Sequence, residues 1–500
     1  MEWRPSIQPS PVRAALGVAA LAAALLAGSP ARWVAMAPPD PTATSPRSAQ
    51  LAVSSAPQAR VVPHVHVAGG DVPAVDVRCE GGAWKSIPWS DLDREVIAPG
   101  RCELRFRVDR GASALRIPVC AGRRAVRIDG RDVVAPPGPL VAALGPGPHE
   151  VLVVVQVSGY ERRIACGEPP QVGEPFTEVE GLGTLTFASP HASKGGGVAV
   201  VYVPRGHDVH RPGPLLVGTH PWNGSMWTYA AYGEMLLEAS RRDVLLLLPQ
   251  GLGNSLYTAD AEDEVLRAID ALSAAVAVDS RAISIWGASM GGAGATTIAL
   301  HHPDHFAMVA SFFGDSRYDR ATYVGRILRS DAEAHAVNAL DVVDNARHLP
   351  VWLIHGEEDR TSKIAQSEML ADAMRQRGYV VRFDRVAGAG HDGSLVARFV
   401  GDVVDAAADA RVPIRVTGVT YRSVRPSDLG AYGVVIERSS SAGDAFVDIE
   451  EHDGIVEVRR AEGVRSIRVA RGALGTDPAR PPSIVFATPD ARVDAAWQDR

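Results

Sequence analysis

A serine lies between two glycines where an apolar stretch of the chain meets an alanine-rich stretch. The segment AISIWGASMGGAGATTIAL, residues 282–300, contains the pattern Gly287-x-Ser289-x-Gly291. In a sharp turn from a strand into a helix, a serine side chain projects above the carboxyl edge of a sheet, and the turn leaves room only for glycine two positions before and after it. The helix dipole also favours negative charge near the helix N-terminus. Ser289 is therefore a candidate nucleophile.

A serine hydroxyl becomes a good nucleophile only when a histidine accepts its proton and an acid orients that histidine. In a sheet with this turn, the three residues follow one another along the chain in the order serine, acid, histidine. Asp359 follows the apolar run VWLIHG, and His391 lies in a glycine-lined loop after VVRFDRV. The sequence predicts that Ser289, Asp359 and His391 form a catalytic triad.

Three other acids are alternatives to Asp359 as the partner of the histidine. Glu358 precedes Asp359 directly, Asp392 follows His391 directly, and Asp315 follows the apolar run FAMVASFFG. An acid in a loop can also serve as a cap or as a hydrogen-bonded loop residue, so position alone leaves these alternatives open.

Hydrolysis through a serine also needs two N–H groups that stabilise the oxyanion of the tetrahedral intermediate. Met290 follows the nucleophile and is expected to supply one of them. The loop THPWNGS is expected to supply the other, and since Pro221 has no N–H, Trp222 is the first choice and Asn223 the second. We expect Trp227 and Asn223, with Trp222, to line the substrate pocket, although the tryptophans could equally pack under a loop. No metal and no cofactor is required.

The elements that must position these residues form an alternating series. Apolar runs typical of buried strands, such as PLLVGTH, DVLLLLPQ and AISIWG, alternate with amphipathic stretches such as AEDEVLRAIDALSAAVAV. This alternation predicts a mostly parallel sheet with helices on both faces, over residues 176–410. The stretch from Ser316 to Leu349 is long for a connection, and we expect a small helical cap over the site, with a purely structural insertion as the alternative.

Two β-rich regions flank this predicted catalytic domain. Residues 64–175 contain short strand-like runs between Gly and Pro turns and predict a β-sandwich-like domain. All four cysteines fall there, which favours two disulfides over reduced core cysteines or a zinc site. Their pairing is open. Residues 411–500 return to alternating strands and predict a C-terminal β-rich appendage, either a separate unit or strands packed on the catalytic domain.

The N-terminus has the features of an export signal. An apolar run at residues 14–28 follows arginines and is shorter than a membrane span, and the small residues of AMA at 35–37 form a candidate cleavage site. We therefore expect a signal peptide at 1–37, with a short uncleaved anchor as the weaker alternative, then a Pro/Ala/Ser/Thr-rich linker at 38–63. The protein is predicted to be secreted or periplasmic, without a stable membrane span after leader removal.

The composition limits the partners. The net charge is −7, and no basic run or basic-aromatic stripe stands out, so no nucleic-acid partner is expected. The expected partner is a small-molecule or polymer ester substrate. Nothing in the composition predicts the oligomeric state.

The motifs GASMGGAG, HHPDHFAMVASFFGD, LPVWLIHGEED and GAGHDG resemble α/β-hydrolases of the secreted esterase and prolyl-oligopeptidase-like group, including relatives of polyhydroxybutyrate depolymerase and feruloyl esterase. The resemblance covers about Leu182 to Ala408, and the usual His-Gly before the oxyanion loop is replaced by His220-Pro221. It implies an α/β-hydrolase fold, a serine hydrolase mechanism, and the triad named above.

Three functions follow from this interpretation. The first is an exported serine hydrolase that cleaves carboxylic esters through an acyl-enzyme. A prolyl-oligopeptidase-like peptidase is the second, disfavoured because about a hundred residues of predicted β structure are too few for the propeller typical of such enzymes. The third is a non-catalytic binding protein on a hydrolase fold.

Overall fold

The computed structural model describes residues 59–63, 65–94, 96–109, 111–192, 196–480, 483–487 and 493–498. The predicted signal peptide and most of the predicted linker lie outside these residues. The linker prediction is wrong for its last residues, because Arg60–Pro63 form strand β1 and pair with β12 of the catalytic sheet. No helix in the described part of the chain combines the length and the apolar character that a bilayer crossing requires.

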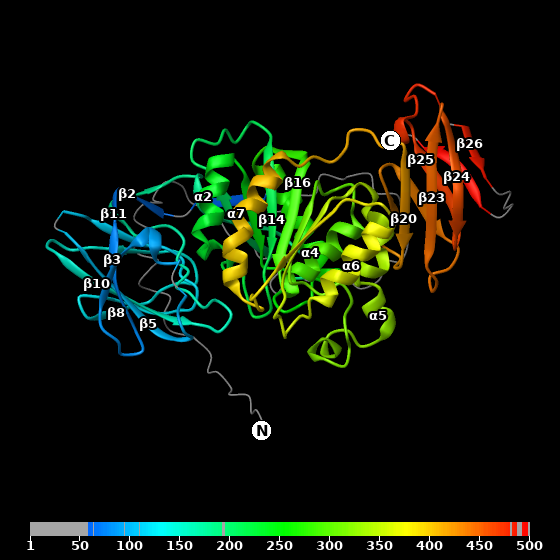
Figure 1. Cartoon of the computed structure of the whole chain (residues 1–500). Coiled ribbons are helices and arrows are strands. Elements are labelled where there is room, and N and C mark those ends of the chain that lie inside the picture. The colour runs from blue at the N-terminus through cyan, green and yellow to red at the C-terminus, as the bar shows by residue number, and fades with distance from the viewer. Residues whose placement is uncertain are drawn as a thin grey trace, which may run out of the picture. The chain divides into compact units, whose positions relative to one another are not determined.

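The central sheet of the described chain has nine strands in the order β1-β12-β13-β15-β14-β16-β17-β18-β19. Two of them, β14 and β16, are labelled in Figure 1. The strands from β15 onward in this order pair in parallel, and β1, β12 and β13 pair antiparallel. After β1, the bounds are β12 (Gly181–Ala188), β13 (Gly196–Val203), β14 (Gly213–Thr219), β15 (Leu245–Pro249), β16 (Val278–Ala288), β17 (Val309–Phe312), β18 (Val351–Gly356) and β19 (Val381–Val386).

Helices cover both faces of this sheet. One apolar cluster joins helices α2 (Gly233–Arg242) and α7 (Gly393–Asp409) to one face. A second joins α3 (Ala259–Ala275), α4 (Met290–His301) and α6 (Ala365–Gln376) to the other. Every residue of β15, LLLLP, is buried, as a strand covered on both faces requires. The predicted α/β-hydrolase fold is confirmed by this architecture.

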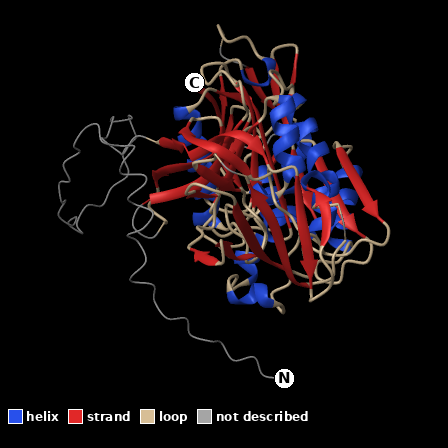
Figure 2. Cartoon of the chain, turned by 90° about the vertical axis from the view of Figure 1, so that its left-hand side faces the viewer, coloured by secondary structure: helices blue, strands red, loops and turns tan. Residues whose placement is uncertain are grey.

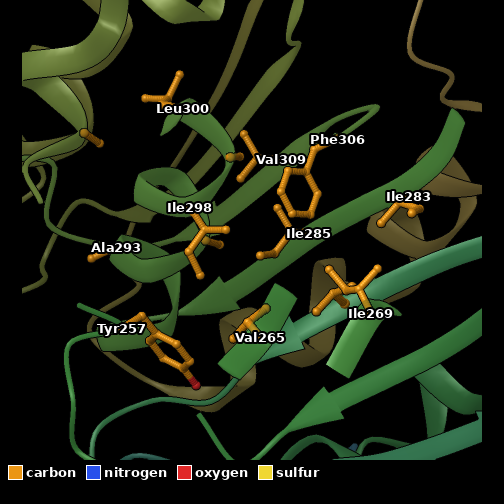
Figure 3. Packing of buried hydrophobic residues seen from close by; sticks show 14 of the residues in the cluster. Tyr257, Val265, Ile269, Ile283, Ile285, Ala293, Ile298, Leu300, Phe306 and Val309 are labelled. Carbon is orange, nitrogen blue, oxygen red and sulfur yellow. The ribbon is translucent and has the colours of Figure 1, made fainter. Parts of the chain in front are cut away.

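The core on the α3–α4 face shows why the serine turn is firmly supported. Ile283 and Ile285 of β16 belong to one apolar cluster with Ile298 of α4 and with Val265 and Ile269 of α3 (Figure 3). All twelve residues of α4 are buried, so this helix is held on every side. The turn between β16 and α4, which carries Ser289, is therefore fixed at both of its ends.

The N-terminal β region folds into two antiparallel sheets with a shared apolar core. Its two disulfides join Cys79 to Cys102 and Cys120 to Cys166, as the cysteine usage predicted, and none of these cysteines is free. One sheet contains β3 (Ala74–Cys79), β4 (Lys85–Pro88), β5 (Gly100–Val108), β7 (Arg123–Ile128), β8 (Arg131–Val133) and β10 (His149–Val157). The other contains β2 (Val65–Asp71), β6 (Ala114–Ile117), β9 (Leu140–Ala143) and β11 (Gln171–Thr177).

The C-terminal β region also forms two sheets around its own apolar core. One contains β20 (Gly418–Ser423), β23 (Ala445–His452), β24 (Ile455–Glu462) and β26 (Ser483–Phe486). The other contains β21 (Gly430–Ala431), β22 (Val434–Arg438), β25 (Val464–Ala470) and β27 (Asp494–Gln498). All α-helices of the described chain lie between Gly233 and Asp409, whereas strands come from all of its parts (Figure 2).

The stretch from Ser316 to Leu349, which was expected to cap the site, packs against the core of the catalytic domain instead. It forms the 3₁₀ helix η3 (Tyr323–Arg326), α5 (Asp331–His335) and η4 (Ala339–His348). Its apolar residues, including Val324, Leu328 and Val343, belong to the core cluster on the α4–α6 side of the sheet. None of its described residues lines the cleft at Ser289. The expected cap is therefore wrong, and the stretch is a packed structural insertion.

Candidate active site

Ser289 occupies a strained turn at the carboxyl end of β16. Its φ is +56°, in the left-handed region that few residues other than glycine adopt. A Cβ atom at Gly291 would lie 1.8 Å from the carbonyl oxygen of Thr219, and one at Gly287 would lie 2.4 Å from the Thr219 hydroxyl. Both glycines are thus sterically required, as the sequence motif predicted. The turn leaves the Ser289 side chain partly exposed.

Three side chains from distant parts of the chain meet at this edge. The Nε2 atom of His391 lies 2.8 Å from Oγ of Ser289, and Nδ1 lies 2.7 Å from Oδ2 of Asp359. When Nδ1–H donates to the carboxylate, Nε2 of the neutral ring is left to accept the serine proton. The order serine, acid, histidine and the loop positions after β16, β18 and β19 agree with the sequence prediction.

The surroundings of Asp359 keep it ionised. Burial alone would raise its pKa, but hydrogen bonds from His355 and His391 and from the N–H groups of Thr361 and Ser362 hold the pKa well below its ordinary range. The side chain is fully buried. A permanent carboxylate at this place fixes the histidine tautomer and favours a positive charge on the ring when it takes a proton.

The three alternative acids are engaged elsewhere or point away. Asp392 accepts a hydrogen bond from the Ser394 N–H and so caps α7. Asp315 accepts a hydrogen bond from the hydroxyl of Ser362, and burial raises its pKa. Glu358 is exposed. Of these four acids, Asp359 alone forms a hydrogen bond with the imidazole of His391.

The predicted oxyanion residues lie beside Ser289. Met290 begins α4 directly after the serine, and the first N–H groups of a helix have no partner within the helix. Trp222 borders the cleft at Ser289, as do Asn223 and Trp227. The N–H of Asn223 donates to Oδ1 of Asn254 at 2.7 Å, which removes the second choice for the oxyanion donor.

A cleft of about 1020 Å³ opens above Ser289 and His391. One wall is the loop 221–228 of the catalytic domain, and the opposite wall comes from the N-terminal β region at 119–125, 133–137 and 156–161. Trp227 is largely buried against this second wall, because a Cβ atom at Gly138 would lie 2.7 Å from its ring. The N-terminal region therefore shapes the space above the serine.

Two residues near the site were missed by the sequence reasoning. His355 is buried, and its Nε2 lies 2.8 Å from the carbonyl oxygen of Ser362 and 3.4 Å from Oδ2 of Asp359. Its place in VWLIHG, four residues before Asp359, was the available signal.

Tyr160 comes from the N-terminal region. Its carbonyl oxygen accepts a hydrogen bond from the Gly393 N–H at 2.6 Å, and its ring centroid lies 6.2 Å from that of His391. Phe313 also packs on this imidazole, with its ring centroid 4.5 Å from that of His391 and 6.3 Å from that of Tyr160. No motif in the surrounding sequence marks Tyr160. Among the described residues, no group of three or more His, Cys, Asp or Glu side chains is placed to hold a metal ion.

Comparison with known proteins gives one family and several solved structures. The model of the prolyl oligopeptidase family matches residues 253–407. An S-formylglutathione hydrolase from Agrobacterium tumefaciens is 20% identical, with 46% of this chain and 95% of that one covered and a TM-score of 0.41. An acylaminoacyl peptidase from Pyrococcus horikoshii is 18% identical, with 48% and 45% covered and a TM-score of 0.39.

A ferulic acid esterase is 18% identical, with 45% of this chain and 97% of that one covered and a TM-score of 0.40. No curated protein matches the sequence at a significant level. The family match ends just before the end of α7 and includes the serine turn and the loops of Asp359 and His391. Together with the strand order of the central sheet, this match supports a serine hydrolase of the α/β-hydrolase superfamily, similar to the prolyl oligopeptidase family over residues 253–407.

Proposed function

We propose that this protein is an exported serine hydrolase that cleaves carboxylic esters through an acyl-enzyme. The observation that carries the proposal is the continuous hydrogen-bonded series Ser289–His391–Asp359 at the floor of an open cleft. A hydroxyl 2.8 Å from an imidazole nitrogen, with a permanent carboxylate behind the ring, is the arrangement that nucleophilic attack on a carbonyl carbon requires.

In the proposed reaction, Oγ of Ser289 attacks the ester carbonyl carbon while Nε2 of His391 takes the hydroxyl proton. The N–H groups of Met290 and Trp222 stabilise the oxyanion. The tetrahedral intermediate collapses, the C–O bond to the alcohol breaks, and the imidazolium gives its proton to the leaving alcohol. Water then attacks the acyl-enzyme by the same steps, so the acid is released and Ser289 is regenerated.

A peptidase is the second candidate, because the family match over 253–407 is to prolyl oligopeptidases. The ester function is preferred because the described strands before the catalytic domain form two small sheets with two disulfides, and no propeller precedes the central sheet in the described part of the chain. Hydrolysis of a p-nitrophenyl ester and of the p-nitroanilide with the same acyl group separates the two candidates. An anilide rate equal to the ester rate would favour the peptidase.

Export is proposed from the same chain. Two disulfides persist in oxidising compartments such as the periplasm or the medium, and this supports the N-terminal leader as an export signal. Fractionation of cells that express the full chain tests it. Recovery of the protein, with both disulfides formed, outside the cytoplasm supports export, and recovery of reduced protein in the cytoplasm would contradict it.

The catalytic claim is tested with p-nitrophenyl butyrate. The purified protein is expected to hydrolyse it, the Ser289→Ala variant to lose nearly all activity, and Ser440→Ala to keep it, because Ser440 is an exposed residue of the C-terminal region. A folded protein that hydrolyses neither this ester nor the anilide, and that retains tight binding to a polymer, would favour a non-catalytic binding protein.

A further inference from the structure

The wall that the N-terminal region contributes to the cleft contains an irregular strand. In the pairing of β7 with β10, Val154 lies opposite Ala125 and Val155 lies opposite Arg123, so Arg124 is an extra residue without a partner in the ladder. This is a β-bulge, which redirects side chains and is common beside functional sites. Consecutive residues of a regular strand point to opposite faces, yet Arg123 and Arg124 both line the cleft.

These arginines have no acidic partner among the described residues. Arg123 donates only to backbone carbonyl oxygens, those of Pro118, Pro136 and Gly138, and burial lowers its pKa. Arg123 therefore has a structural role, because its hydrogen bonds hold together the loops of this wall of the cleft. Arg124 is exposed, and it forms no hydrogen bond or ion pair with any residue that the structure describes.

The cleft contains little negative charge to balance them. Glu161 is the only described carboxyl side chain in its lining. It is buried, it accepts hydrogen bonds from the Tyr232 hydroxyl, it lies 4.0 Å from Arg163, and burial raises its pKa. An exposed guanidinium without an acidic partner in an open cleft can bind a carboxylate with charge-assisted hydrogen bonds. The wall opposite the catalytic loops thus carries unbalanced positive charge.

We propose that Arg124 binds an anionic group of the substrate, so that the preferred substrates are esters with a free carboxylate away from the scissile bond. The proposal rests on the proposed ester hydrolysis at Ser289. It assigns the N-terminal region a part in substrate selection, through a side chain that touches substrate but no reacting atom.

The test compares anionic and neutral esters in two matched pairs. On the acyl side, mono-p-nitrophenyl glutarate is compared with p-nitrophenyl butyrate. On the alcohol side, 4-acetoxybenzoate is compared with its methyl ester. Each kcat/KM is divided by the rate of the uncatalysed reaction with hydroxide, and the readout is the ratio of the anionic to the neutral ester.

The variants are Arg124→Gln, Arg124→Lys and a control, Arg107→Gln. Arg107 is an exposed arginine of β5 in the same sheet and does not line the cleft. In at least one pair, we expect the ratio to fall about tenfold in Arg124→Gln, to recover partly in Arg124→Lys, and to stay near the wild-type value in Arg107→Gln. Sodium chloride at high concentration should reduce the wild-type ratio.

An unchanged ratio in Arg124→Gln in both pairs, or an equal fall in Arg107→Gln, would overturn the proposal. Titration of glutarate into the Ser289→Ala variant and into Ser289→Ala with Arg124→Gln gives a readout without turnover, and equal affinity in the two would also overturn it. The proposed function fails separately, if the wild-type protein hydrolyses no neutral ester.

Discussion

The two β regions are built alike and relate to the catalytic domain in different ways. The N-terminal region lines the cleft and contacts the histidine loop through Tyr160. The C-terminal region lines no part of the cleft among the described residues, and it meets the catalytic domain through ion pairs and hydrogen bonds, such as Arg422 with Asp344 and Asp428 with His301. A sandwich of strands beside a hydrolase domain can thus complete a site or be a purely structural neighbour, and its contacts decide which.

The largest expected effect is on kcat, and it should differ between two buried aspartate–histidine pairs, one in each contact region. Asp359→Asn should lower kcat about 10⁴-fold with little change in stability, because the amide favours the wrong tautomer of His391. Asp428→Asn alters a pair of similar geometry, 2.8 Å from Nδ1 of His301 and 1% exposed, at the contact with the C-terminal region. It should leave kcat near wild type and lower the free energy of unfolding by about 3 kcal/mol.

Steady-state kinetics and urea unfolding of both variants measure these effects. A large loss of kcat in Asp428→Asn, or near-normal kcat in Asp359→Asn, would mean that the catalytic pair has been assigned to the wrong contact.

The next effect concerns the disulfides, which only the N-terminal region has. The Cys120–Cys166 bridge closes a loop with a sequence separation of 46 and Cys120 lines the cleft, whereas Cys79–Cys102 spans 23 residues. Loop-closure entropy predicts that replacing both cysteines with alanine costs about 4 kcal/mol for the first bridge and about 3 kcal/mol for the second. Guanidinium unfolding gives the two costs, and only the first replacement should also reduce activity. Equal activity in both variants would argue against a catalytic part for the N-terminal wall.

A smaller effect is expected for the tyrosines that join each β region to the catalytic domain. Tyr160→Ala removes the ring beside His391 and should lower kcat about tenfold, since small displacements of a catalytic group are costly. Tyr432→Ala removes a hydrogen bond to the Pro303 carbonyl at the C-terminal contact and should change stability without a change in kcat. Tyr160→Phe retains the ring and should restore most of the rate. Equal kcat in the two alanine variants would contradict the difference between the regions.

The smallest effect is the response of the two contacts to pH. At the contact of the N-terminal region with the catalytic domain, Asp93 lies beside Glu234 of α2. Burial, together with the hydrogen bond and charge of Glu234, raises the pKa of Asp93 to about 7, and the charge of Arg163 opposes this shift. Because the folded state binds the proton more tightly, the stability from Asp93 is present below its ordinary pKa of 3.8 and is lost as the pH rises toward 7.

The C-terminal contact has the opposite sign. Burial opposes ionisation of Asp428, but hydrogen bonds and charge from His301 and Arg425 lower its pKa below the ordinary 3.8. Its stability is present above that value and is lost as the pH falls below it. Asparagine resembles the neutral acid, so relative to wild type Asp93→Asn should become more stable as the pH rises toward 7, whereas Asp428→Asn should become less stable as the pH rises above 3.8. Melting temperatures of wild type and both variants from pH 3 to 8 measure this, and shifts of the same sign near neutral pH would contradict the assigned pKa directions.

The sequence predicted the catalytic domain well because its signals are local. The run LLLLP is buried on both faces, as its continuous apolar character predicts. The glycines around Ser289 are required because side chains there would collide with Thr219 at the end of the neighbouring strand β14. The loop positions of Asp359 and His391 follow from strand order, so the meeting of the three side chains could be predicted before any distance was known.

Other features depend on how distant parts of the chain pack against one another, and the hydrophobic periodicity of the sequence does not indicate this. The contact of Tyr160 with the histidine loop and the bulge at Arg124 have no pattern in the sequence. The expected cap was wrong because a helical pattern does not say which surface its apolar face will cover, and Leu328 covers the core. The hydrogen bond from the N–H of Asn223 to Asn254, which excludes Asn223 as the oxyanion donor, also has no signal in the sequence.

The central claim is that Ser289 is an activated nucleophile, and a fluorophosphonate probe tests it most directly. After reaction with the folded protein and digestion, mass spectrometry should find the adduct on the peptide that contains Ser289, and the adduct should be absent from Ser289→Ala and strongly reduced in His391→Ala. An unmodified Ser289 in folded wild-type protein, or an adduct on a different serine, would contradict the claim.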